Sequence, residues 1–79
     1  MVHTDYSVGD HVRFLKKMGP GLAGSIGQVR LVNDFGLSVR IVYNHLGRPF
    51  QFTVSAQPFE NFEPVSEEEI RELEAANAE

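Results

Sequence analysis

The chain has 79 residues and a formal net charge of −4, with no cysteine and no tryptophan. A chain of this length forms one domain that buries only about 60–65% of its unfolded surface, which argues against a deep substrate cavity. The absence of cysteine excludes a disulfide framework and a thiolate metal site, and it favours a reducing compartment. No stretch approaches the roughly 18 apolar residues that span a bilayer, and residues 1–5 lack the features of a signal peptide. We therefore expect a cytoplasmic protein without a membrane partner.

The negative charge is concentrated at the C-terminal end. Residues 1–63 carry six Lys or Arg and five Asp or Glu, whereas residues 64–79 carry one and six. Nucleic-acid binding must therefore be judged from a nearly neutral body. The pattern predicts three parts: a flexible N-terminus over residues 1–7, a folded body over residues 8–65 and an acidic helical tail over residues 66–79.

A turn and a long loop enclose the first predicted strand. Residues 8–10 form a turn, and the alternation of apolar and polar residues over residues 11–15 predicts a half-buried strand. Four glycines and one proline fall between Gly19 and Gly27, which excludes a helix and predicts a loop over residues 16–25.

Three further strands are predicted, over residues 26–33, 37–43 and 49–56, joined by short turns. The last of them alternates most regularly. We expect its apolar residues, Phe50, Phe52 and Val54, to face the core together with Phe14 and Phe59. Replacing Phe52 with alanine is then expected to cost about 3–5 kcal/mol of stability.

The C-terminal region predicts a short turn, a brief strand and a helix. Residues 57–61 suit a 3₁₀ turn, and residues 62–65 suit a closing strand. Ser66 and Glu69 have the spacing of a capping box, which predicts a helix from Glu67 to about residue 76. Its apolar stripe is only Ile70, Leu73 and Ala76. We therefore expect partial helicity and a contribution below about 1 kcal/mol to stability.

This order of elements resembles an SH3-like barrel, and the resemblance implies a mainly β fold: a five-stranded SH3-like barrel with a short acidic C-terminal helix. Two segments are similar to the KOW pattern of ribosomal large-subunit proteins and transcription elongation factors, namely Val8-Gly9-Asp10-His11-Val12-Arg13-Phe14 and Gly24-Ser25-Ile26-Gly27-Gln28-Val29. The same pattern occurs in accessory barrels of electron transport, such as the small photosystem I stromal subunit and the variable chain of ferredoxin-thioredoxin reductase. KOW segments that bind RNA are usually basic, whereas the loop around Leu22 is apolar.

The sequence shows no constellation of catalytic residues. The three histidines, His3, His11 and His45, have no partner at a compact metal-ligand spacing. His11 could pair with Asp10 as a base and its orienting group, but adjacent strand residues point to opposite faces. The glycine-rich loop lacks the Lys-Ser/Thr ending of a phosphate-binding loop and leads into a strand. We expect no enzyme activity, no cofactor and no metal.

The leading hypothesis is a non-enzymatic interaction module or accessory subunit that binds a protein partner through its loops. The residues predicted to make that contact are Lys17, Met18, Leu22, Phe35 and Tyr43. Met18 and Leu22 could instead fold back over the barrel, which leaves both interpretations open.

Two other functions remain open. The first is a KOW-type nucleic-acid-binding module. The residues predicted for it are Arg13, Lys16, Lys17, Arg40 and Arg48. The second is an accessory subunit of an electron-transfer or metalloenzyme complex, which the resemblance of fold alone implies.

Overall fold

The structure is a computed structural model, and it describes residues 6–78. Its elements follow the order β1 (His11–Phe14), β2 (Ile26–Val32), β3 (Leu37–Tyr43), β4 (Pro49–Gln57), a 3₁₀ turn η1 (Phe59–Asn61), β5 (Phe62–Pro64) and α1 (Glu67–Ala76). Each element predicted from the sequence is present, with bounds that differ by at most a few residues. Within the described range, no helix is both long and apolar enough to cross a membrane.

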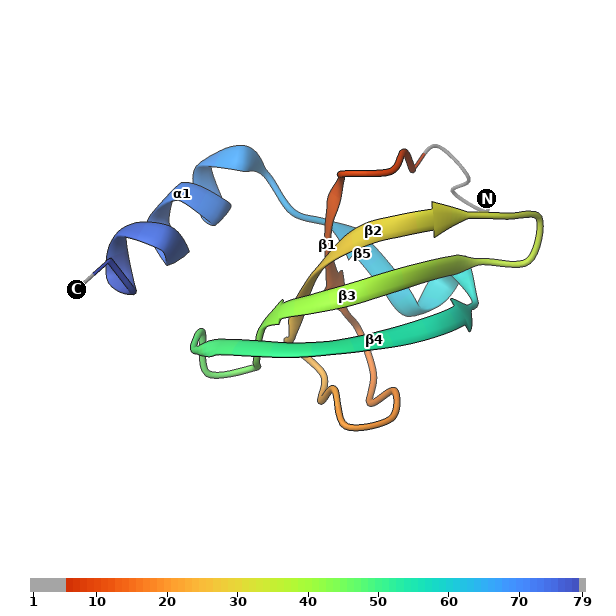
Figure 1. Ribbon diagram of the computed structural model, residues 1–79, viewed down its shortest axis with the longest axis horizontal. Helices are drawn as coiled ribbons and strands as arrows, with labels where there is room; N and C mark the ends of the chain where they lie inside the picture. The colour runs from red at the N-terminus through yellow and green to blue at the C-terminus, as the bar shows by residue number, and fades with distance from the viewer. Residues whose placement is uncertain (1–5, 79) are drawn as a thin grey trace.

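The five strands form one antiparallel sheet in the order β4-β3-β2-β1-β5 (Figure 1). The mainly β prediction is therefore confirmed at the level of five antiparallel strands and one C-terminal helix. β4 and β5 are the two edges of this sheet. The pairing of β3 with β4 has two register shifts, on either side of the run from Val39 to Ile41.

One face of the sheet, called here the core face, carries the main hydrophobic cluster. Its ten buried residues are Val12, Phe14, Met18, Val29, Leu37, Val39, Ile41, Val54, Phe59 and Phe62. The rings of Phe14 and Phe62 meet edge to face at 5.4 Å, and this geometry suits the quadrupoles of two aromatic rings. Tyr6 packs against the cluster from outside, with its ring stacked on Phe59.

The predicted burial of Phe50 and Phe52 is wrong. Val54 is buried, but the side chains of Phe50 and Phe52 are 37% and 46% exposed. Phe52 lies opposite Ile41 on the core face, so the predicted alternation holds from Phe52 to Val54, but a register shift separates this run from Pro49. These two rings are exposed because β4 is an edge strand and the chain covers the core face beside it only as far as Val54.

The glycine-rich loop provides that cover. A Cβ atom on Gly21 would lie 2.7 Å from side-chain atoms of both Phe14 and Ile41, and one on Gly19 would lie 3.9 Å from Val54. Only a residue without a side chain lets the backbone approach the core so closely at Gly21. The loop therefore folds back over the sheet.

Met18 is part of this cover, which corrects its prediction as an exposed contact residue. Its side chain is 4% exposed and belongs to the core cluster. The backbone groups of Met18 and Gly21 exchange two hydrogen bonds, of 2.8 and 3.0 Å. The Asn61 side-chain amide lies 3.6 Å from the Met18 sulfur and donates to it. Burial in this tight turn removes Met18 from any surface that could bind a partner.

Helix α1 lies against the sheet instead of extending freely. The Ser66 hydroxyl accepts a hydrogen bond from the Glu69 amide (3.2 Å), as expected for the helix N-cap. The Glu69 carboxylate, predicted to reach back to residue 66, forms an ion pair with Arg13 of β1 instead. At the other end, the Asn77 side-chain amide donates to the Gly47 carbonyl (2.9 Å). Both ends of the helix are therefore bonded to the sheet or its turns.

The apolar stripe of α1 packs on the face opposite the core, called here the outer face. Ile70 is buried and Leu73 half-buried, whereas Ala76 is exposed. Ile26 is also buried but lies outside the core cluster, opposite Arg13 in the pairing of β1 with β2. The docked helix explains why an isoleucine on the outer face is protected from water. The helix has the predicted bounds, Glu67–Ala76, and its docked position argues for a larger contribution to stability than the expected limit of about 1 kcal/mol.

Candidate protein-binding surface on β4

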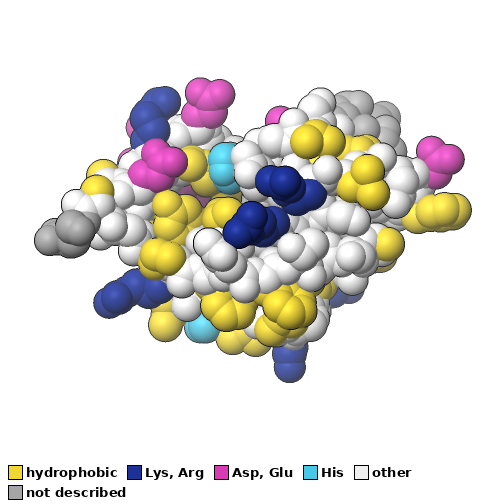
Figure 2. Space-filling view, in the orientation of Figure 1, with side chains coloured by type: hydrophobic (Ala, Val, Ile, Leu, Met, Phe, Trp, Pro, Cys, Tyr) yellow, Lys and Arg dark blue, Asp and Glu magenta, His cyan; other side chains and the backbone are white. Residues whose placement is uncertain are grey.

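The exposed apolar side chains around β4 form the strongest candidate site. We call this set the β4 surface: Leu22 in the loop, Leu46 in the turn before β4, and Phe50 and Phe52 in β4 itself. All four are exposed. Figure 2 shows hydrophobic side chains gathered along the lower side of the molecule, where β4, the turn before it and the glycine-rich loop run in Figure 1. Apolar side chains gathered in this way are typical of a contact surface.

The backbone of β4 gives this surface a second property, a free strand edge. Among residues 6–78, β4 pairs with β3 only. The five residues from Pro49 to Thr53 are all exposed, and β4 contains no charged residue along its nine positions. Edge strands usually carry charged residues that prevent pairing with another chain. Pro49 at the start of β4, the positive φ of Ala56 (53°) near its end and a register shift on either side of the run from Phe52 to Val54 interrupt this edge.

The structure separates the residues predicted from the sequence for protein binding. Leu22 and Lys17 are exposed on the loop. Tyr43 is half-buried at the end of β3, opposite Pro49 at the start of β4. Phe35 is 81% exposed, but it lies in the β2–β3 turn, at the opposite end of β3 from Tyr43. Tyr43 therefore lies beside the start of β4 and the turn that holds Phe35 lies beside its end, so the predicted residues do not form one patch.

The basic residues predicted for nucleic-acid binding are spread over separate elements. Arg13 pairs with Glu63 (2.6 Å) and with Glu69, so its charge is neutralised inside the molecule. Arg40 lies on the outer face, opposite Gln28 and Thr53. The remaining three, Lys16, Lys17 and Arg48, are exposed in the loop after β1 and in the turn before β4. This arrangement lacks the continuous basic stripe that tracks a phosphate backbone.

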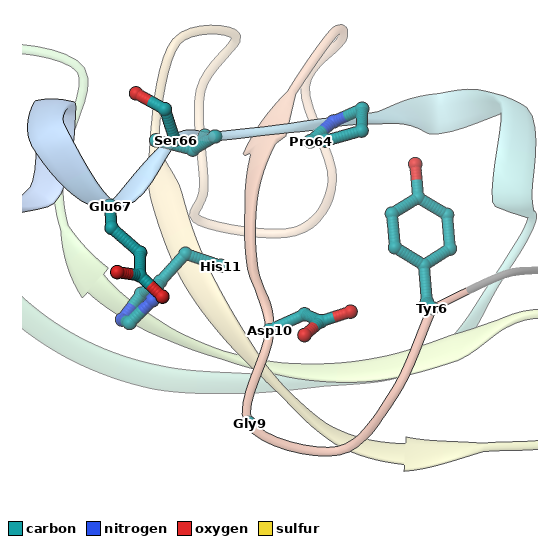
Figure 3. A pocket seen from close by; sticks show the side chains of 8 residues that line it. Tyr6, Gly9, Asp10, His11, Pro64, Ser66 and Glu67 are labelled. Carbon is teal, nitrogen blue, oxygen red and sulfur yellow. The ribbon is translucent and has the colours of Figure 1, made fainter.

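A cleft of about 420 Å³ lies between the N-terminal segment, β1 and the start of α1. Figure 3 shows Asp10 and His11 pointing away from each other at this cleft, so they do not form a base and its orienting group. The Asp10 carboxylate instead accepts a hydrogen bond from the Ser7 amide (2.9 Å). Burial raises the pKa of the Tyr6 hydroxyl, with smaller contributions from Glu63 and Asp10.

Among residues 6–78, no group of three or more His, Cys, Asp or Glu residues could hold a metal ion. His11 lines the cleft, His45 is exposed in the turn before β4, and His3 lies outside the described residues. The geometry of the described residues therefore favours the β4 surface over the cleft as the functional site.

Comparisons with protein-family models, curated proteins and solved structures found no match to this chain.

Proposed function

We propose that this chain is a non-enzymatic interaction module that binds another protein through the β4 surface. The observation that carries the proposal is the exposure of Phe50 and Phe52 on an edge strand without charged residues. Aromatic side chains at a partly open site supply much of the energy of protein interfaces, because each buries a large area at little cost in conformational entropy. A free strand edge adds backbone hydrogen bonds to that contact.

We also propose that the sheet is an SH3-like barrel, and that the protein acts in the cytoplasm. Three features support the fold proposal: the strand order β4-β3-β2-β1-β5, the long loop between β1 and β2, and the 3₁₀ turn directly before β5. The lack of cysteine supports a reducing compartment. A protein that binds a partner through the β4 surface could serve as an accessory subunit of a larger complex.

A photo-crosslinking amino acid at position 52 tests the proposed function. The matched control carries the same group at position 31, because Leu31 is similarly exposed but lies in β2, inside the sheet. We expect irradiation in cells to give discrete protein adducts from position 52 and few from position 31. Adducts from neither position, or equal yields from both, would contradict the proposal.

A second measurement tests the alternative function, nucleic-acid binding. Titrations with labelled single- and double-stranded oligonucleotides over a range of salt concentrations are expected to show weak binding only. Strong binding near physiological salt, with a steep salt dependence that Arg40→Ala and Arg48→Ala reduce, would favour the KOW-type function instead.

A further inference from the structure

We propose that the first partner of the β4 edge is a second copy of this chain, added as an antiparallel strand about a two-fold axis at Thr53. The inference rests on the proposed function, since it uses the same surface, and it names both the partner and the mode of binding. Two-fold dimers are the commonest oligomers, because one surface patch that complements itself suffices to form them.

The side-chain pattern of β4 complements itself in this arrangement. In the regular run of β4, Phe52 and Val54 lie opposite the core residues Ile41 and Val39, and Thr53 between them lies opposite Arg40 on the outer face. A two-fold axis at Thr53 sets Phe52 opposite Val54 of the second copy and Gln51 opposite Ser55. Apolar side chains then meet on the core face and polar, uncharged ones on the outer face. Such cross-strand pairs are the units that stabilise a sheet.

The register follows from the same alternation. A slip of one residue between the two β4 strands would place apolar side chains opposite polar ones. The exposed ring of Phe52 would gain a neighbour on the core face only in a register that keeps the two faces matched. Since no charge lies between Pro49 and Gln57, the second copy meets no repulsion along the strand.

Charges at the two ends of β4 select the antiparallel direction. Arg48 lies directly before β4 and is exposed. Glu60 lies in η1, just after β4, and is exposed as well. Figure 2 shows a Lys or Arg side chain projecting at the lower left of the molecule, on the side where β4 begins in Figure 1. An antiparallel second strand places the basic start of each β4 beside the acidic end of the other, whereas a parallel strand would place like charges together.

Asp34 adds to the acidic end. It is exposed in the β2–β3 turn and lines a shallow cleft together with Phe59 of η1. The end of β4 therefore lies near two carboxylates, and its start follows directly after a guanidinium. In a two-fold dimer the basic start of each β4 would meet the acidic end of the other, which gives two equivalent contacts between opposite charges.

Sedimentation velocity of the purified full chain over a range of concentrations tests the inference. We expect a monomer–dimer equilibrium that shifts toward dimer as concentration rises. Gln51→Lys and Phe52→Lys place a charge on the edge and are expected to raise the dimer dissociation constant about tenfold or more. Leu31→Lys adds the same charge to an exposed position of an inner strand and should leave the constant unchanged. Thermal melting shows that each variant is folded, and the exposed Gln51 gives a second edge variant if Phe52→Lys is unstable.

A charge exchange tests the antiparallel direction. Arg48→Glu alone is expected to weaken the dimer, and adding Glu60→Arg to the same chain is expected to restore it, since both ends then carry opposite charges again. Three results would overturn the inference: a wild-type monomer at millimolar concentration, a Leu31→Lys effect as large as that of the edge variants, or a double variant that does not recover. A monomer whose position 52 still crosslinks another protein would leave the proposed function standing. A dimer whose position 52 crosslinks only its own copy would support the inference and overturn the role in binding a different protein.

Discussion

Arg13 on β1 and Glu69 on α1 form an ion pair that joins the sheet to the helix. The same guanidinium bonds Glu63 on β5 at 2.6 Å, so one arginine links three elements. Opposite Arg13 in the sheet lies Ile26, which is buried on the outer face. The acidic C-terminal helix is therefore docked at the end of that face near Ile26, and the surface beneath α1 is removed from the candidate binding sites.

Replacing Ile70 with alanine is expected to destabilise the protein, because Ile70 is 7% exposed under the docked helix. Loss of a buried isoleucine costs about 2 kcal/mol or more, and each kcal/mol lowers the melting temperature of a domain of this size by about 4–8 °C. Arg71→Ala, at an exposed position of the same helix, should change the melting temperature little. A chain shortened after Val65 that melts at the temperature of the full chain would show that α1 does not cover the sheet.

Two phenylalanines of the same sheet are expected to differ in their contributions to stability. Phe14 is 1% exposed and contacts the ring of Phe62, so Phe14→Ala should cost about 3–5 kcal/mol. Phe52→Ala should cost about 1 kcal/mol, because the ring is nearly half exposed on the edge strand. Chemical denaturation of the two variants gives both values. Equal losses would mean that Phe52 is a core residue.

Gly36 is expected to tolerate no side chain. A Cβ atom there would collide with the carbonyl oxygen of Gln57 and lie 3.2 Å from the Cα atom of Pro58. Because these obstacles are backbone atoms, the end of β4 must shift, and Gly36→Ala should lower the free energy of unfolding by about 1–3 kcal/mol. Asp34→Ala, in the same turn but exposed, serves as the control in thermal melting. A Gly36→Ala variant as stable as its control would contradict this close approach.

Stability is expected to fall in alkaline solution through Tyr6. Burial raises the pKa of its hydroxyl above the ordinary value of 10.0, and the hydroxyl lies 3.4 Å from the Phe62 carbonyl, to which it donates. Below pH 10 the hydroxyl is neutral in the folded and in the unfolded state, so its full contribution to the free energy of unfolding is present. Above that pH the unfolded chain loses the proton first, so the free energy of unfolding decreases as pH rises through the pKa of the folded state.

Denaturant titrations between pH 8 and pH 11 measure this slope, and Tyr6→Phe provides the comparison. The variant keeps the ring that stacks on Phe59 but has no hydroxyl to ionise. Its stability should fall less steeply with pH than that of the wild type. The same slope in both proteins would assign the alkaline loss to other groups.

Local patterns predicted the elements well, because each depends on neighbours in the sequence. The alternation from Leu37 to Tyr43 gave the bounds of β3 without error, and the spacing of Ser66 and Glu69 located the start of α1. The failures concern contacts between distant segments. Alternation shows which residues of β4 share a face. It does not show that β4 is an edge strand, or that no other segment packs over the side chains in the first half of this strand.

The candidate site was predicted only in part for the same reason. Leu22 was expected at a contact surface and lies exposed beside the core face, but Met18, four residues earlier, is buried because Gly21 lets the loop fold inward. Phe50 and Phe52 were assigned to the core because aromatic residues in a regular strand usually pack there. The one sequence feature that agrees with an edge is Pro49 at the start of β4, whereas the lack of charged residues along its nine positions is typical of an inner strand.

The central claim is that the edge of β4 pairs with a second copy of this chain. Hydrogen exchange of the β4 amides, measured on the purified full chain at micromolar and at millimolar concentration, tests it most directly. We predict that exchange at residues 50–55 slows as the concentration rises, because a second strand protects the amides that point away from β3, while exchange in β2 stays the same. Exchange at residues 50–55 that is rapid and identical at both concentrations would contradict the claim.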